Sequence, residues 1–75
     1  MRKSLAETVA AQVRAEMASQ QRKSQSLAAE LRVSDMWVSR RLRGRTAISL
    51  SDLERIGTAV GRAVDRFLPT PERAG

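Results

Sequence analysis

The spacing of the apolar residues restricts the fold of this chain most strongly, because these residues recur at every third or fourth position. An α-helix has about 3.6 residues per turn, so side chains at this spacing line one face of a helix. The clearest four-residue series comprises Leu5, Val9, Val13 and Met17. No segment alternates apolar and polar residues as a half-exposed β-strand does. The sequence therefore predicts an all-α fold.

Two helices are expected in the first half of the chain. The first covers about residues 4–19 and carries the four-residue series on its inner face. Residues 20–23 interrupt the apolar pattern, and Ser24 is then expected to cap a second helix of about two turns over residues 24–31. Its inner face would carry Leu27, Ala28 and Leu31.

A third and a fourth helix are expected to follow, each with a serine at its start and a glycine at its end. Ser34 caps the third, over about residues 35–43, because a serine hydroxyl accepts from the free amides of the first turn. Gly44 ends that helix in the left-handed conformation, and Ser49 and Gly61 bound the fourth in the same way. The expected apolar series on these helices are Val38, Leu42, Leu50, Leu53, Ile56 and Val60.

The rest of the chain is expected to add little structure. Ile48 fills the loop before the fourth helix, and residues 63–68 form a short fifth helix. Residues 69–75, with two prolines and one alanine as the only apolar residue, are expected to be a disordered tail or a linker. The prediction is one domain over residues 1–68, a compact bundle of four to five helices.

The composition excludes several classes of protein. Without cysteine or histidine, the chain has neither a disulfide nor the usual ligands of a zinc site. The carboxylates are scattered along the helices, so no catalytic residues are expected, and neither a metal, a cofactor nor a small-molecule ligand is expected. No apolar run approaches the roughly 20 residues of a membrane span, which predicts a cytoplasmic protein.

The net charge of +6 indicates a polyanionic partner. The excess lies entirely in residues 1–46, because residues 47–75 carry equal numbers of acidic and basic residues. The densest cluster consists of Arg40, Arg41, Arg43 and Arg45. DNA, RNA and anionic lipid are the candidate partners from charge alone. The alternative is an arginine-rich solvated surface in a protein from a GC-rich genome.

The expected helices 24–31 and 35–43, joined by a short turn, form a helix-turn-helix pair, in which the second helix enters the major groove of DNA. A helical projection places Val38, Leu42 and Asp35 on the inner side. The same projection places Met36, Ser39, Arg40 and Arg43 on the outer side. Arginine can pair with guanine or phosphate, and methionine with a thymine methyl group. An exposed solvated face is the alternative.

Trp37, the only tryptophan, and Arg41 lie one turn apart on the border between these two faces, where they can form a cation–π pair. Trp37 is expected either to cover the seam between the second and third helices or, in addition, to reach the DNA. A contact between two copies of the chain is a third option.

The stretch "SLAAELRVSDMWVSRRLRG", followed by "ISLSDLERIGTAVGRAVDRFL", resembles the lambda-repressor and Cro class of helix-turn-helix domains, the XRE family, over residues 24–68. The matching positions are Leu27, Ala28, Val33, Ser34, Val38, Ser39, Arg40, Gly44, Ser49, Leu50, Ala59, Val60 and Gly61. The resemblance implies a lambda-repressor-like bundle that binds double-stranded DNA sequence-specifically. It also implies a transcription regulator of phage or bacterial origin, a repressor or Cro-like protein, acting as a homodimer on paired half-sites.

The resemblance implies which residues contact DNA, and the helical projection adds Ser39. The expected base contacts are Asp35, Met36, Trp37, Ser39 and Arg40. The expected phosphate contacts are Lys23, Ser24, Gln25, Arg43 and Arg45. Ser24 replaces the usual glutamine of the family, so Lys23 or Gln25 is expected to substitute. The expected location is a bacterial nucleoid or a phage-infected host cell.

Two further residues depart from the family pattern. Arg32 stands where the turn usually has glycine, and a left-handed backbone at that position would cost about 1 kcal/mol or more. Arg41 replaces a residue that is frequently apolar.

Two other functions remain open from the residues. A protein-interaction module, such as the antitoxin of a toxin–antitoxin pair, can share this fold but uses an extra apolar surface or tail. A nonspecific binder of chromatin or RNA would share the charge but not the sequence preference.

Overall fold

The computed structural model describes residues 4–68, and its secondary structure there is entirely helical. The elements are α1 (Leu5–Ser19), α2 (Ser24–Leu31), α3 (Asp35–Leu42), α4 (Leu50–Val60) and the short 3₁₀ helix η1 (Val64–Arg66). The prediction of an all-α bundle is confirmed, although the fifth element is a single turn of 3₁₀ helix. The predicted tail or linker over residues 69–75 lies outside the described residues.

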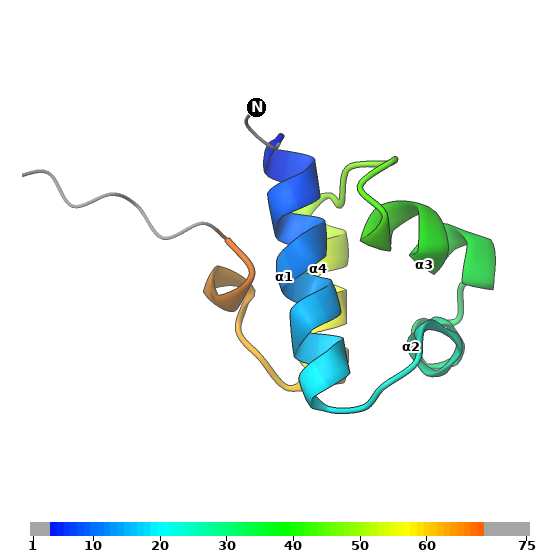
Figure 1. Cartoon of the computed structure of the whole chain (residues 1–75). Helices are drawn as coiled ribbons and strands as arrows, with labels where there is room; N and C mark the ends of the chain where they lie inside the picture. Colours follow the sequence, from blue (N-terminus) through cyan, green and yellow to red (C-terminus); the bar gives the residue numbers. More distant parts are fainter. Residues whose placement is uncertain (1–3, 69–75) are drawn as a thin grey trace, which may run out of the picture.

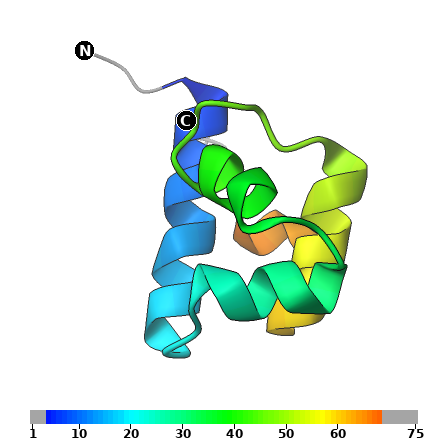
Figure 2. The same cartoon turned by 90° about the vertical axis from the view of Figure 1, so that its right-hand side faces the viewer.

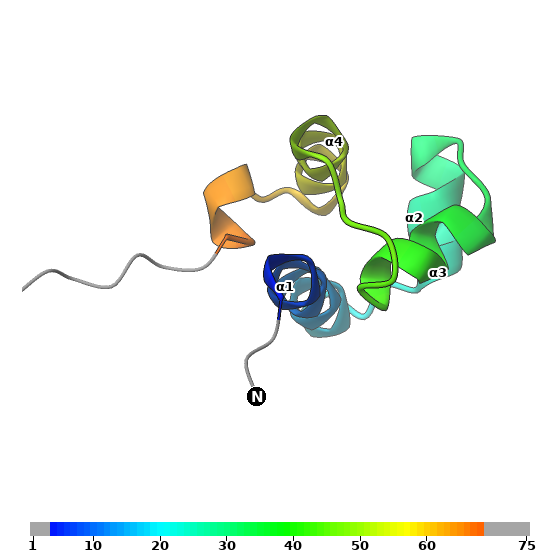
Figure 3. The same cartoon turned by 90° about the horizontal axis from the view of Figure 1, so that it is seen from above.

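The helices α2 and α3 form one side of the molecule (Figure 1). Seen from above, they lie to one side of α1 and α4, and η1 lies on the opposite side (Figure 3). The helix α2 packs against α3 and α4, and α3 also packs against α1. The helix-turn-helix pair is therefore held against both long helices.

A single hydrophobic core joins these elements. Its buried members are Val9, Ala10, Val13, Met17, Leu27, Ala28, Leu31, Val38, Leu42, Leu53, Ile56, Val60 and Phe67. Ile48 packs against this core from the loop, as predicted. Leu5 and Leu50, which the apolar series also included, are 63% and 64% exposed. Each is the first residue of its helix, where the chain has not yet reached the core.

Serine side chains cap α1, α3 and α4. Ser34 accepts a hydrogen bond from the Trp37 amide at 3.0 Å, and Ser49 accepts one from the Asp52 amide at 3.1 Å. Both caps were predicted. At the start of α1, Ser4 and Glu7 bond reciprocally, each side chain accepting from the amide of the other.

The predicted cap of α2 is wrong. Ser24 is the first residue of the helix, and Lys23, with an extended backbone at φ −99° and ψ 154°, is the N-cap. The helix starts there because the Lys23 carbonyl already accepts from the Ser26 and Leu27 amides, at 3.0 and 3.2 Å. No side chain accepts a hydrogen bond from the first amides of this helix.

Each of the four α-helices is followed by a residue with left-handed backbone. Gly44 and Gly61, which were predicted to end α3 and α4, have φ angles of 75° and 73°. At the ends of α1 and α2 the same conformation is adopted by Gln21 and Arg32, with φ angles of 57° and 60°. A residue with a side chain is strained in the left-handed backbone conformation. Arg32, which stands where the family usually has glycine, therefore has an energetic cost.

Replacing Arg32 with glycine is therefore expected to raise the free energy of unfolding by about 0.5–1 kcal/mol. The Arg32 side chain makes no hydrogen bond or ion pair within the described chain, so the effect isolates the backbone. Urea titration followed by circular dichroism measures it. Ala29→Gly, an exposed position inside α2, is the control and should lower the free energy by about 1 kcal/mol. A loss of stability in Arg32→Gly would contradict the expected strain.

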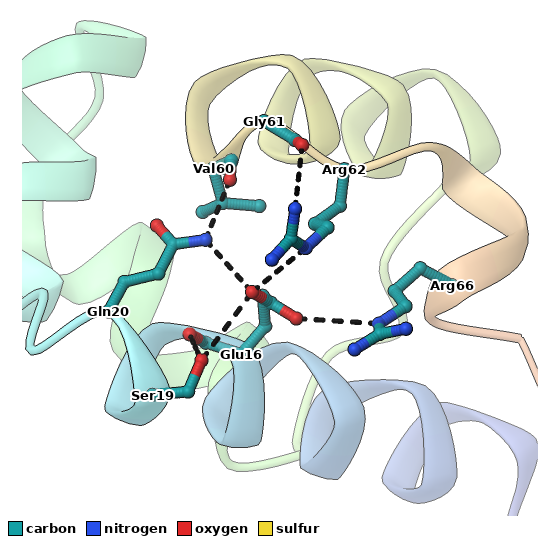
Figure 4. Close-up of polar contacts among 7 residues, drawn as sticks. All are labelled: Glu16, Ser19, Gln20, Val60, Gly61, Arg62 and Arg66. Atoms are coloured by element: carbon teal, nitrogen blue, oxygen red, sulfur yellow. Dashed lines mark hydrogen bonds and ion pairs between the residues drawn. The ribbon is translucent and has the colours of Figure 1, made fainter.

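One carboxylate, Glu16, is buried where α1 faces the end of α4 (Figure 4). Its Oε2 accepts from Gln20 Nε2 at 2.9 Å and from Arg62 Nε at 3.1 Å. Its Oε1 lies 3.5 Å from Arg66 Nε. Gln20 also donates to the Val60 carbonyl at 2.8 Å. The cluster ties α1 to the end of α4 and to η1.

The hydrogen bond from Gln20 lowers the pKa of Glu16 below its ordinary value of 4.5, and the positive charges of Arg62 and Arg66 add to this. These effects outweigh burial, which raises the pKa. Since the folded-state pKa is the lower one, the ionised carboxylate stabilises the fold above pH 4.5. That contribution is lost as the pH falls through the folded-state value.

The melting temperature of the wild-type protein is consequently expected to fall more steeply below pH 4.5 than that of Glu16→Gln. Thermal denaturation followed by circular dichroism from about pH 7 to pH 3 gives both curves. Glu54→Gln, which removes an exposed carboxylate, should behave as the wild type. Parallel curves for wild type and Glu16→Gln would show that the cluster does not stabilise the ionised form.

Candidate nucleic-acid interface

The third helix is fixed by its inner face and by its last turn. Val38 and Leu42 are 1% and 9% exposed, as the projection predicted. From α1, Arg14 donates a hydrogen bond from its guanidinium group to the Leu42 carbonyl. The Arg45 and Gly44 amides then bond back to the third helix, to the Arg40 and Arg41 carbonyls. Both the apolar face and the carbonyl end of α3 are therefore anchored.

The outer face of α3 is open to solvent. Figure 2 looks onto this side of the molecule, with α2 and α3 in front of the other helices. Met36 is 59% exposed, and Asp35, Arg40 and Arg43 are also exposed, whereas Ser39 is half-buried. The structure thus brings the predicted outer residues together on α3 and its C-cap, Arg43. The inward placement of Asp35 was wrong, because Asp35 is the first residue of the helix and is exposed.

Trp37 is half-buried and packs against the hydrophobic core. The Arg41 guanidinium group lies over its ring, 3.9 Å from the ring centroid, which confirms the predicted cation–π pair. Arg41 also donates to the Trp37 carbonyl at 3.2 Å. The packing agrees with a role of Trp37 in covering the seam between helices, and its contact with DNA stays a prediction.

Most arginines outside the stretch from 23 to 45 hold structural partners. Arg22 donates to the Ala59 carbonyl at the end of α4, at 2.6 Å. Arg55 donates to the Leu31 carbonyl at the end of α2, at 2.7 Å. A positive group at a helix C-terminus is favourable because the carbonyls there carry partial negative charge. These roles could not be predicted from the sequence, since nothing in the local pattern distinguishes such an arginine from a surface arginine.

The remaining cations are concentrated near the helix-turn-helix pair. Within residues 4–68, the basic side chains that make no hydrogen bond or ion pair are Lys23, Arg32, Arg40, Arg43 and Arg45. An arginine-rich surface that is only solvated would not require the paired and the unpaired basic residues to lie in different parts of the chain. The unpaired positive charge is thus placed on and beside α2 and α3, whereas the paired arginines hold the framework.

The predicted phosphate contacts flank α3. Lys23 and Gln25 are exposed and Ser24 is half-buried at the uncapped start of α2. Arg43 and Arg45 are exposed at the other end, where α3 passes into the following loop. Amides at a helix start and arginines at a loop both suit phosphate oxygens. No cluster of three or more potential metal ligands occurs in the described part of the chain.

No protein-family model matches the chain, and no curated protein sequence matches it at a significant level. Solved structures do match. The clp gene regulator ClgR from C. glutamicum has 29% sequence identity and a TM-score of 0.84, covering 88% of this chain and 86% of that one. A hypothetical transcription factor, NHTF, from Neisseria has 26% identity and a TM-score of 0.81, covering 91% of this chain and 78% of that one.

The chain is similar to transcription regulators in both fold and sequence. A second structure of ClgR from Corynebacterium glutamicum agrees, with a TM-score of 0.83 and 28% identity over 89% of this chain. These neighbours are described as a gene regulator and a hypothetical transcription factor. Among the described residues, no helix has the length and the apolar character of a membrane span.

Proposed function

We propose that this chain is a sequence-specific double-stranded DNA-binding domain of a transcription regulator of the XRE class. A bacterial or phage repressor, or a Cro-like protein, fits the sequence resemblance best, with a location in a bacterial nucleoid or a phage-infected cell. The observation that carries the proposal is the gathering of unpaired cations around the exposed face of a helix whose other face is anchored. Similarity to ClgR and NHTF supports it.

In this proposal α3 lies in the major groove and reads base edges. Arg40 pairs with guanine O6 and N7, and Met36 contacts a thymine methyl group. Asp35 accepts from a cytosine amino group, and Ser39 donates to or accepts from an adjacent base. Trp37 contacts the edge of the groove. An anchored helix is needed for such readout, because contacts to base edges tolerate little displacement.

Phosphate contacts position the domain on the duplex. At one end, Lys23 and Gln25 and the uncapped amides of α2, including that of Ser24, meet one strand. At the other end, Arg43 and Arg45 meet phosphates beyond α3. Selection of bound sequences from a random DNA library tests the proposal directly. A defined motif is expected, and a symmetric one would indicate a homodimer on paired half-sites.

Salt dependence gives a second test. With roughly five phosphates neutralised, the slope of log K against log salt is expected to be about −4 to −5. Arg45→Ala should weaken binding to selected and random DNA alike and make the slope shallower by about 0.9. Arg62→Ala, which removes an arginine paired with Glu16 near η1, is the matched control and should leave the slope unchanged. A wild-type slope near zero would rule out phosphate binding.

The alternative function, a protein-interaction module such as an antitoxin, needs a continuous apolar surface. The large exposed hydrophobic residues of the described chain are Leu5, Met36, Leu50 and Leu68. They lie on four separate segments and not on one. A stable protein partner in a pull-down, together with failure to retard any genomic DNA fragment, would favour this alternative over DNA binding.

A further inference from the structure

We propose that Arg41 is a positioning residue for DNA reading, which holds the Trp37 ring in place and does not itself contact DNA. This inference rests on the proposed DNA-binding function and concerns how the recognition surface is kept rigid. Arg41 belongs to the dense arginine cluster of the sequence, so from charge alone it would count as one more phosphate ligand.

The surroundings of Arg41 differ from those of its neighbours. Its side chain is 18% exposed, whereas Arg40 and Arg43 are exposed and unpaired. The guanidinium group is enclosed by the Trp37 ring, with its centroid 3.9 Å away, and by the Trp37 carbonyl, which it reaches at 3.2 Å. A group so enclosed offers a phosphate little surface.

A second helix places a carboxylate near the guanidinium group. Arg41 Nε is buried without a hydrogen-bond partner and lies 4.0 Å from Asp52 Oδ2 in the first turn of α4, which is the distance of a long ion pair. Asp52 Oδ1 lies 3.5 Å from Arg55, and Arg55 donates to the Leu31 carbonyl at the end of α2 at 2.7 Å. The series from Leu31 through Arg55, Asp52 and Arg41 to Trp37 therefore connects all three helices around the recognition surface.

The consequence for DNA reading follows from side-chain freedom. Trp37 lies on the border between the buried and the outer face of α3, and a ring held by stacking loses little rotamer freedom when DNA binds. Without Arg41, the ring would keep its packing against the core but lose its stacking partner, and it would therefore move more at that border. Selected DNA should lose affinity, whereas phosphate contacts made elsewhere should be unaffected.

The test compares Arg41→Gln with the wild type on the selected sequence and on random DNA, over a series of salt concentrations. The ratio of specific to random affinity is expected to fall about 5-fold, with the salt slope unchanged. Arg45→Ala should show the reverse, a shallower slope with the ratio preserved. Arg62→Gln makes the same change of charge near η1 and should alter neither quantity.

Fluorescence gives an independent readout, because Trp37 is the only tryptophan. Acrylamide quenching of the free protein should increase in Arg41→Gln and in Asp52→Asn but not in Arg62→Gln. In a Trp37→Leu background, Arg41→Gln should cause no further loss of specificity, since the two residues act together. Circular dichroism confirms that each variant is folded.

Three outcomes separate the possibilities. A slope made shallower by about 0.9 in Arg41→Gln would show a direct phosphate contact and overturn the positioning role. An unchanged specificity ratio in Arg41→Gln, on a sequence that the wild type selects, would overturn this inference alone. Absence of any selected sequence for the wild type would instead contradict the proposed function itself.

Discussion

Replacing Arg40 with alanine is expected to weaken binding to the selected DNA sequence by about 1–3 kcal/mol, or roughly 5- to 150-fold, and to relax specificity at one base pair. The side chain is exposed on the outer face of α3 and has no partner in the described molecule. Its guanidinium group is therefore free to form two parallel hydrogen bonds with a guanine. The loss should concentrate on that one position of the motif.

Binding measured by fluorescence anisotropy, with a panel of single-base substitutions in the selected sequence, resolves this effect. Arg43→Ala is the matched control, because Arg43 is also exposed and unpaired but is expected to contact phosphate. Arg43→Ala should weaken binding to the selected sequence and to its single-base variants by the same factor. Equal losses on selected and random DNA for Arg40→Ala would count against base readout by this residue.

Phe67→Ala is expected to lower the free energy of unfolding by about 3–5 kcal/mol. Phe67 is fully buried, although it follows only a single turn of 3₁₀ helix. Its ring lies against Gly57, where an added Cβ would be 3.6 Å from the ring. Small domains have total stabilities near the lower end of about 5–15 kcal/mol, so this variant should retain only about 0–2 kcal/mol and be partly unfolded at room temperature.

Urea titration at several temperatures measures the loss, with Leu68→Ala as the neighbouring control. Leu68 is 39% exposed, and its truncation should change the free energy by no more than about 0.5 kcal/mol. A wild-type stability in Phe67→Ala would show that the segment after α4 is not part of the core in solution.

The helices could be predicted from the sequence because local signals define them. Ser34 and Ser49 cap the helices that they precede, and Gly44 and Gly61 end α3 and α4 with left-handed backbone. The predicted cap of α2 was wrong because a serine can stand either just before a helix or in its first turn. Only the backbone angles of the preceding lysine decide between the two.

The burial of individual residues was less predictable. Leu5 and Leu50 share the spacing of core residues but lie at helix starts, beyond the reach of the core. Glu16 did give a signal that was overlooked, because it lies seven residues after Val9 and thus on the apolar face of α1. Its partners Arg62 and Arg66 are distant in sequence, so the ion pairs themselves could not be predicted.

Some arginines of this domain have hydrogen-bond or ion-pair partners and others have none, and this difference matters when small basic domains are compared by their charge. Arg43→Gln and Arg55→Gln reduce the net charge by the same amount and would give the same isoelectric point. The first removes a cation that is free to meet a polyanion, whereas the second removes one that already holds a backbone carbonyl. Isoelectric point is thus a poor guide to polyanion affinity in such domains, and a count of unpaired cations on one face is a better one.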